Sequence, residues 1–255
     1  MKTNASLILF LSILALSATS CVHYYYAPSS NNVPLFKEKN EARIQAQSST
    51  VGVGADLEDA TGGFEIQTAY AVGNHTAIQL NFLHAARNEE DYGSGDGNYI
   101  EAAAGYFKPS ANKHWIFETY AGLGTGSVKS IYGADYNSQT AKTSVTKFFA
   151  QPSFGYSSDY FAMAFSSKFS LVNFGVSSSS LSKENSPTDF EYIESFKKGK
   201  SYFWWEPGIM IRAGSKKVQA ITQITYSMQG NDGLPFCSMN YSIGIVVPFN
   251  IKTKQ

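Results

Sequence analysis

Apolar and polar residues alternate along most of this chain from about residue 41 onward. The alternation is clear near the carboxyl end, where every second residue is apolar from Cys237 through Met239, Tyr241, Ile243, Ile245 and Val247 to Phe249. The intervening positions are mostly polar or small, as at Ser238, Asn240, Ser242 and Gly244. Successive side chains of a strand point to opposite faces. The pattern therefore predicts a strand with one apolar face and one polar face.

Nine other segments follow the same pattern, and clusters of turn residues separate them. We predict strands at about 41–53, 62–73, 75–87, 97–108, 113–128, 143–156, 159–174, 200–213, 216–228 and 236–249. Segment 113–128 also contains Gly122, Gly124 and Gly126 at alternate positions. A nucleotide-binding glycine motif opens a helix, whereas these glycines share one face of a strand. We therefore expect them to make room inside the fold.

Alternation alone also fits a soluble sandwich or a lipocalin-like barrel with an inward apolar face. Two features argue against both. The polar faces carry mainly Gln, Asn, Ser, Thr, Gly and Ala instead of the charges of a water-exposed surface. The connections also alternate in length: those at 54–61, 88–96, 129–142, 175–199 and 229–235 are long, and those near 73–74, 109–112, 157–158 and 214–215 are tight. Short periplasmic turns and longer outside loops are typical of outer-membrane barrels.

These features predict an all-β fold, a ten-stranded antiparallel up-and-down transmembrane β-barrel. An even number of strands brings both termini to one side, which the loop lengths identify as periplasmic. Charged residues make up only 16 % of the chain and aromatic residues 15 %, against about 25 % charged residues in a typical soluble domain. A surface that faces lipid explains both figures. The near-zero net charge implies no nucleic-acid partner. No segment after the first twenty residues has the 18 consecutive apolar residues of a membrane-spanning helix.

The chain resembles the small outer-membrane β-barrel families that include the OmpA-type and ten-stranded barrels. The resemblance covers residues 41–249 and is most specific in the last strand. Its outward residues Tyr241, Ile243, Ile245, Val247 and Phe249 resemble the carboxyl-terminal signal that the barrel-insertion machinery recognises. In that signal the final aromatic residue normally ends the chain, whereas here a short tail at 250–255 follows Phe249. The resemblance implies a bacterial outer-membrane location.

The amino-terminal region precedes the strands. Lys2, an apolar run of ten residues and a small-residue zone predict a signal peptide at 1–20, since ten helical residues rise only about 15 Å, too little for a membrane anchor. Cys21 follows this zone and resembles the lipidated cysteine of bacterial lipoproteins, although Leu16 stands five residues before it instead of three. The alternative is an unmodified Cys21 at the mature amino terminus. We expect residues 21–40 to form a periplasmic leader outside the barrel at 41–249.

Nine charged residues fall on the polar faces and are expected to line the lumen. They are Arg43, Glu65, Arg87, Glu101, Glu118, Lys147, Lys168, Glu206 and Arg212. Opposite charges inside a narrow barrel can pair across it, so we predict that this network plugs the lumen. A polar path for small solutes and a catalytic carboxylate pair are the alternatives.

Other candidate sites are weaker, and we predict no catalytic residue, cofactor or metal ion. His23, His75 and His114 fall in leader or turn segments, and His84 lies on the lipid-facing side without an evident Ser or Asp partner. No His and Cys set matches a zinc site. The acidic segment 88–97 has carboxylates that could bind calcium, but it lacks the EF-hand order.

The expected function is therefore structural or interactive and not enzymatic. The barrel would contact outer-membrane lipid and display loops, with 129–142 and 175–199 as the candidate surface for an external ligand. A small-solute channel is the alternative, and an outer-membrane enzyme is a remote third.

Overall fold

The computed structural model describes residues 24–52, 61–89, 93–132, 138–230 and 233–251. The predicted signal peptide 1–20 and Cys21 lie outside these residues. The strands are β1 (Glu41–Gly52), β2 (Thr61–Tyr70), β3 (Thr76–Glu89), β4 (Gly93–Pro109), β5 (Trp115–Tyr132), β6 (Gln139–Ser157), β7 (Phe161–Ser179), β8 (Ser201–Gly214), β9 (Gln219–Tyr226), β10 (Met228–Gln229) and β11 (Met239–Asn250). One helix, α2 (Pro187–Lys197), lies between β7 and β8. Short β10 continues the line of β9, so ten strands build the wall.

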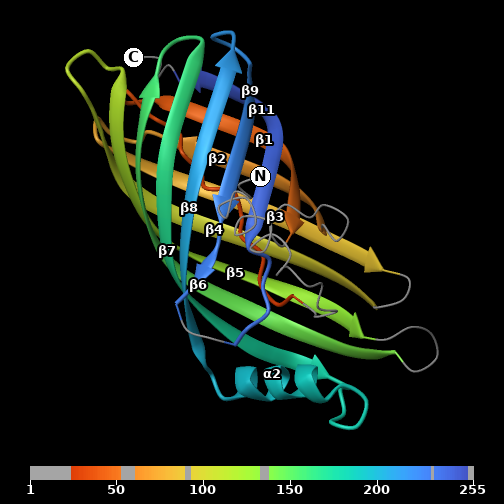
Figure 1. Ribbon diagram of the computed structural model, residues 1–255. Coiled ribbons are helices and arrows are strands. Elements are labelled where there is room, and N and C mark those ends of the chain that lie inside the picture. The colour runs from red at the N-terminus through yellow and green to blue at the C-terminus, as the bar shows by residue number, and fades with distance from the viewer. Residues whose placement is uncertain (1–23, 53–60, 90–92, 133–137, 231–232, 252–255) are drawn as a thin grey trace, which may run out of the picture.

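The strands form a closed antiparallel barrel (Figure 1). Each strand from β1 to β8 pairs with the next one in the sequence. The circle is completed by β8 with β9, β9 with β11, and β11 with β1. The predicted all-β, ten-stranded up-and-down architecture is confirmed. A closed sheet has no free edge, so every strand satisfies its backbone on both sides.

The two ends of the barrel differ, as Figure 1 shows. Tight turns lie at one end, and α2 lies at the other. We call these the tight-turn end and the α2 end. The prediction of a long loop at 88–96 is wrong. Strands β3 and β4 pair as far as Glu89 and Gly93, which leaves only 90–92 between them. The expected loop 129–142 is also shorter, because β5 reaches Tyr132 and β6 begins at Gln139.

Helix α2 was not predicted; we expected a loop at 175–199. Pro187 stands in its first turn, where a missing N–H costs no hydrogen bond. Asp189 near the start and Lys197 near the end match the helix dipole. Ile193 and Phe196, three residues apart, are both 1 % exposed, so they lie on the same face of the helix and pack against the barrel.

The outer face of the wall is apolar and the inner face is polar. Exposed side chains include Ile78, Leu80, Trp115, Phe117, Leu123, Phe148, Phe165, Ile209, Ile224, Ile243 and Ile245, whereas buried ones include Gln47, Gln67, Gln79, Asn81, Gln151, Gln223, Asn240 and Ser242. Cys237 is an exception to the expected faces. It precedes β11, its N–H donates to the carbonyl of Tyr26, and its side chain is buried. Among the described residues, no helix has the length and hydrophobicity to cross a membrane.

Candidate functional site: the filled lumen

Residues 24–36, which we call the luminal segment, lie inside the barrel. We expected all of 21–40 to be a leader outside it, and for 24–36 that expectation is wrong. Tyr25, Tyr26 and every residue from Pro28 to Phe36 are buried. The segment matches its surroundings. Ser29 to Asn32 lie in the polar middle of the lumen, and Val33, Leu35 and Phe36 pack against apolar residues nearer the tight-turn end.

Aromatic side chains close the lumen at the α2 end. Tyr26 stacks on Trp204 with ring centroids 4.4 Å apart. Tyr25 contacts Phe196 of α2 edge to face at 5.2 Å, and its hydroxyl donates to Asp189 at 2.7 Å. These residues belong to one apolar cluster that also contains Phe174, Tyr202 and Leu234. The helix therefore caps the barrel by packing against the luminal segment as well as the wall.

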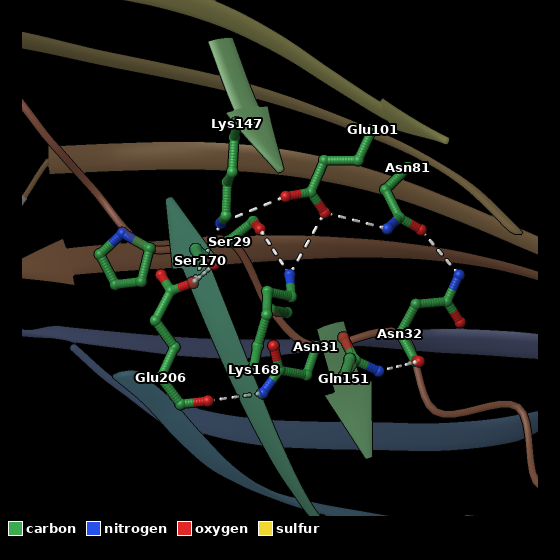
Figure 2. A network of polar contacts seen from close by, with 12 residues as sticks. Ser29, Asn31, Asn32, Asn81, Glu101, Lys147, Gln151, Lys168, Ser170 and Glu206 are labelled. Carbon is green, nitrogen blue, oxygen red and sulfur yellow. Dashed lines mark hydrogen bonds and ion pairs between the residues drawn. The ribbon is translucent and has the colours of Figure 1, made fainter. Parts of the chain in front are cut away.

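A cluster of four charged side chains lies deeper in the lumen (Figure 2). Lys147 bridges Glu101 at 3.2 Å and Glu206 at 3.0 Å, and Lys168 contacts Glu101 at 3.2 Å. All four are at most 1 % exposed. Two carboxylates and two ammonium groups give a neutral cluster. Charges removed from water are tolerated when they are paired and hydrogen-bonded in this way.

The luminal segment takes part in this cluster. The Tyr26 hydroxyl donates to Glu206 at 2.7 Å and accepts from Lys147 at 2.9 Å. Lys168 donates to the Ser29 hydroxyl at 3.4 Å. Gly124 lies between Glu101 and Lys147 in register, and a side chain there would collide with the Tyr99 ring. This fits the expectation that the glycines of β5 make room in the lumen.

Amide side chains and a third carboxylate hold the middle of the segment. Glu65 accepts from the Ser30 N–H at 3.1 Å and from Asn240 at 2.9 Å. Asn31 donates to Ser166 at 3.0 Å, and Asn32 donates to Asn81 at 2.7 Å. These bonds join the segment to β2, β3 and β7, and through Glu65 to β11, so strands from different parts of the wall fix its position.

At the tight-turn end, charged residues bind the segment's backbone. Arg212 donates to the carbonyl of Pro34 at 3.0 Å, and Arg43 donates to that of Leu35 at 3.3 Å. Glu118 accepts from the Phe36 N–H at 2.8 Å. Leu35 has a φ of 55°, an uncommon conformation for a residue other than glycine, which the surrounding contacts hold in place.

The structure places all nine candidate lumen charges within reach of the lumen, but not in one network. Four form the central cluster, and Glu65, Glu118, Arg43 and Arg212 contact the luminal segment's backbone. Arg87 lies farthest toward the α2 end, with its guanidinium 5.6 Å from the centre of the Tyr24 ring. The barrel is therefore filled by its own chain, whose backbone these charges bind, and not by charge pairing alone.

The other candidate residues lie apart from this site. His84 contacts the Asn98 side chain at 3.1 Å, while His75 and His114 contact backbone carbonyls of neighbouring strands. His23 lies outside the described residues. Within the described ranges, no group of three or more His, Cys, Asp or Glu could hold a metal ion. Part of the acidic segment 88–97 lies in β3 and β4, and 90–92 are not described.

Fold and site together define a closed β-barrel whose lumen is filled by an amino-terminal segment. The solved structures similar to it include Ail, the attachment invasion locus protein of Yersinia pestis, with a TM-score of 0.37 and 14 % identity over 83 % of this chain and 99 % of Ail. OmpT, an outer membrane protein of Vibrio cholerae, has a TM-score of 0.27 and 6 % identity over 85 % of this chain and 100 % of its own. At these scores the likeness carries no argument about function. No family model and no curated protein matches the chain.

Proposed function

We propose that this chain is a bacterial outer-membrane β-barrel with a structural or interaction role, closed to solutes by its luminal segment. The distribution of apolar side chains carries the proposal. Large apolar residues on the outer face are exposed on every side of the wall, among them Leu123 at 57 % and Ile243 at 56 %. Soluble monomers rarely expose apolar patches beyond a few hundred Å². Lipid accommodates such a surface, and a closed barrel leaves no unpaired strand edge in the membrane.

The α2 end is the proposed outer end, because outer-membrane barrels have their longer connections outside the cell. Helix α2 and the β5–β6 connection would then face the exterior and offer the surface for an external ligand. Glu191 and Lys197 are exposed on α2. Strand β11 is the proposed signal for the insertion machinery, since Phe249 and the other outward residues of that strand lie on its lipid-facing side and the strand ends at Asn250.

We also propose that Cys21 is lipidated. In that step the cysteine sulfur bonds to the glyceryl carbon of a phosphatidylglycerol donor, the carbon–oxygen bond to the headgroup phosphate breaks, and the thiol proton leaves with the glycerol phosphate. Radiolabelled palmitate should enter the wild-type protein and be absent from Cys21→Ser. Labelling that persists in Cys21→Ser would contradict the assignment.

Two measurements on the full chain test the barrel and its closure. The unboiled protein should migrate differently from the boiled protein on a detergent gel and should float with membrane vesicles. In planar bilayers the inserted protein should show no steady conductance, because the lumen holds residues 24–36. Recovery in a soluble periplasmic extract would refute the membrane location. Steady ion flow through the wild-type protein would favour the small-solute channel instead.

A further inference from the structure

The luminal segment has a defined direction, and its first residues lie at the α2 end. Tyr24 faces Arg87 near the end of β3. The N–H of Tyr25 donates to the carbonyl of Pro235 at 3.1 Å, in the connection between β10 and β11. The Tyr132 hydroxyl, at the last residue of β5, donates to that of Tyr25 at 3.3 Å. The ends of β3 and β5 and the connection between β10 and β11 therefore contact the start of the segment.

The last residues of the segment and those that follow lie at the opposite end. Arg212, which binds Pro34, stands two residues before the end of β8 at Gly214. Glu38 forms an ion pair at 3.1 Å with Lys113 in the turn between β4 and β5. The Ile251 N–H, just past the last strand, donates to the carbonyl of Asn40 at 2.9 Å. The carboxyl end of the described chain is thus at the tight-turn end.

The length of the segment agrees with a full crossing. Twelve residue steps separate Tyr24 from Phe36, and an extended chain advances about 3.3 Å per step, or roughly 40 Å in all. The hydrocarbon core of a bilayer is about 30 Å thick. Residues 24–36 are therefore long enough to pass from one membrane face to the other inside the barrel.

We propose that the chain crosses the membrane inside its own barrel, so that its amino end is presented on the same face as α2 and the longer connections. The part about the membrane rests on the function proposed above. This placement is opposite to that of a periplasmic leader, and it separates the amino and carboxyl ends by the thickness of the membrane. Three residues of extended chain reach at most about 11 Å, so a lipid on Cys21 would enter the leaflet on the α2 side.

Single cysteines can test the proposal in whole cells. We would place them at His23, at Lys183 between β7 and α2, and at Lys216 in the turn between β8 and β9, each in a Cys21→Ser, Cys237→Ser background. Lys183 and Lys216 are exposed, so they report the two ends of the barrel. A membrane-impermeant maleimide should label His23→Cys and Lys183→Cys in intact cells, and Lys216→Cys only after the outer membrane is permeabilised.

The possible results separate the two proposals. If His23→Cys is labelled together with Lys216→Cys and apart from Lys183→Cys, the amino end lies at the tight-turn end and the inference is wrong. If His23→Cys and Lys183→Cys are both protected while Lys216→Cys is labelled, the threading stands and the proposed orientation of the barrel fails. A short epitope inserted after Val22 in the wild-type chain, detected by antibody on intact cells, gives the same comparison with Cys21 retained.

Discussion

Phe36 provides a direct test of the filled lumen. Its side chain is fully buried, contacts the edge of Phe107 with centroids 5.8 Å apart, and lies 5.9 Å from the Arg43 guanidinium. A buried aromatic side chain removes roughly 150–250 Å² from water, and Phe→Ala in a core costs about 3–5 kcal/mol. We expect Phe36→Ala to lower the stability of the docked segment by that amount. A leader outside the barrel would leave Phe36 solvated and the substitution nearly neutral.

The assay should follow release of the segment as well as barrel unfolding. Trp204 stacks on Tyr26, so a Trp115→Phe, Trp205→Phe variant keeps one tryptophan that senses the segment. Urea titration of the refolded protein in detergent micelles, followed by this fluorescence and by strand circular dichroism, measures both events. In Phe36→Ala the fluorescence transition should move to lower urea concentration.

Lys39→Ala is the matched control. Lys39 is exposed just beyond the segment, and such surface substitutions usually change stability by less than about 0.5 kcal/mol. Equal effects of Phe36→Ala and Lys39→Ala on both transitions would refute the placement of residues 24–36 in the lumen.

Three further predictions concern the wall, the charge cluster and the remaining thiol. Ile243→Arg puts a charge on the outward apolar face, which the proposed function places in lipid. It should destabilise the protein by roughly 2–4 kcal/mol in lipid vesicles. A cost near zero in urea unfolding would show that this face does not meet lipid. Lys147→Met leaves Glu101 and Glu206 buried without the cation that they share and should lower the free energy of unfolding by about 3–5 kcal/mol. The double variant Lys147→Met, Glu206→Gln should recover part of that loss. A double variant no more stable than Lys147→Met would contradict the pairing. Burial raises the pKa of Cys237 to about 12. At pH 8 its thiol should therefore react with a maleimide only in the unfolded protein. Rapid reaction in the folded protein would show that the thiol is accessible to solvent.

The strands could be predicted from sequence because their signal is local. Alternation in 219–226, with Ile224 outward and Gln223 inward, depends only on the two-residue period of a strand. The tight turns were also evident, since residues such as Gly214 and Ser215 interrupt the pattern. Strand ends were less certain: β6 and β7 extend several residues beyond the apolar belt, where outward positions such as Thr140, Lys142 and Ser144 are polar and the contrast between faces fades.

The filling of the lumen could not be predicted from the same signal. Residues 24–36 have no strand period, and Ser29 to Asn32 are typical of a solvated linker. Two observations could have indicated their position. Val33, Leu35 and Phe36 form an apolar group that a linker does not need. The nine predicted inward charges are five cations and four carboxylates, so they cannot all pair with one another. Helix α2 was missed for a related reason, since its buried face contains only Ile193 and Phe196.

The position of the luminal segment also constrains the order of folding. Residues 24–36 are synthesised before any strand, yet the cavity that holds them is complete only when β11, the last strand, pairs with β1. Glu65 on β2 and Asn240 on β11 meet at Ser30, so contacts far apart in the sequence form together, which slows folding. Threading a finished barrel would require the segment to pass the charged middle of the lumen, where Tyr26 and Ser29 accept hydrogen bonds from Lys147 and Lys168. We therefore expect the wall to close around a segment that is already in place.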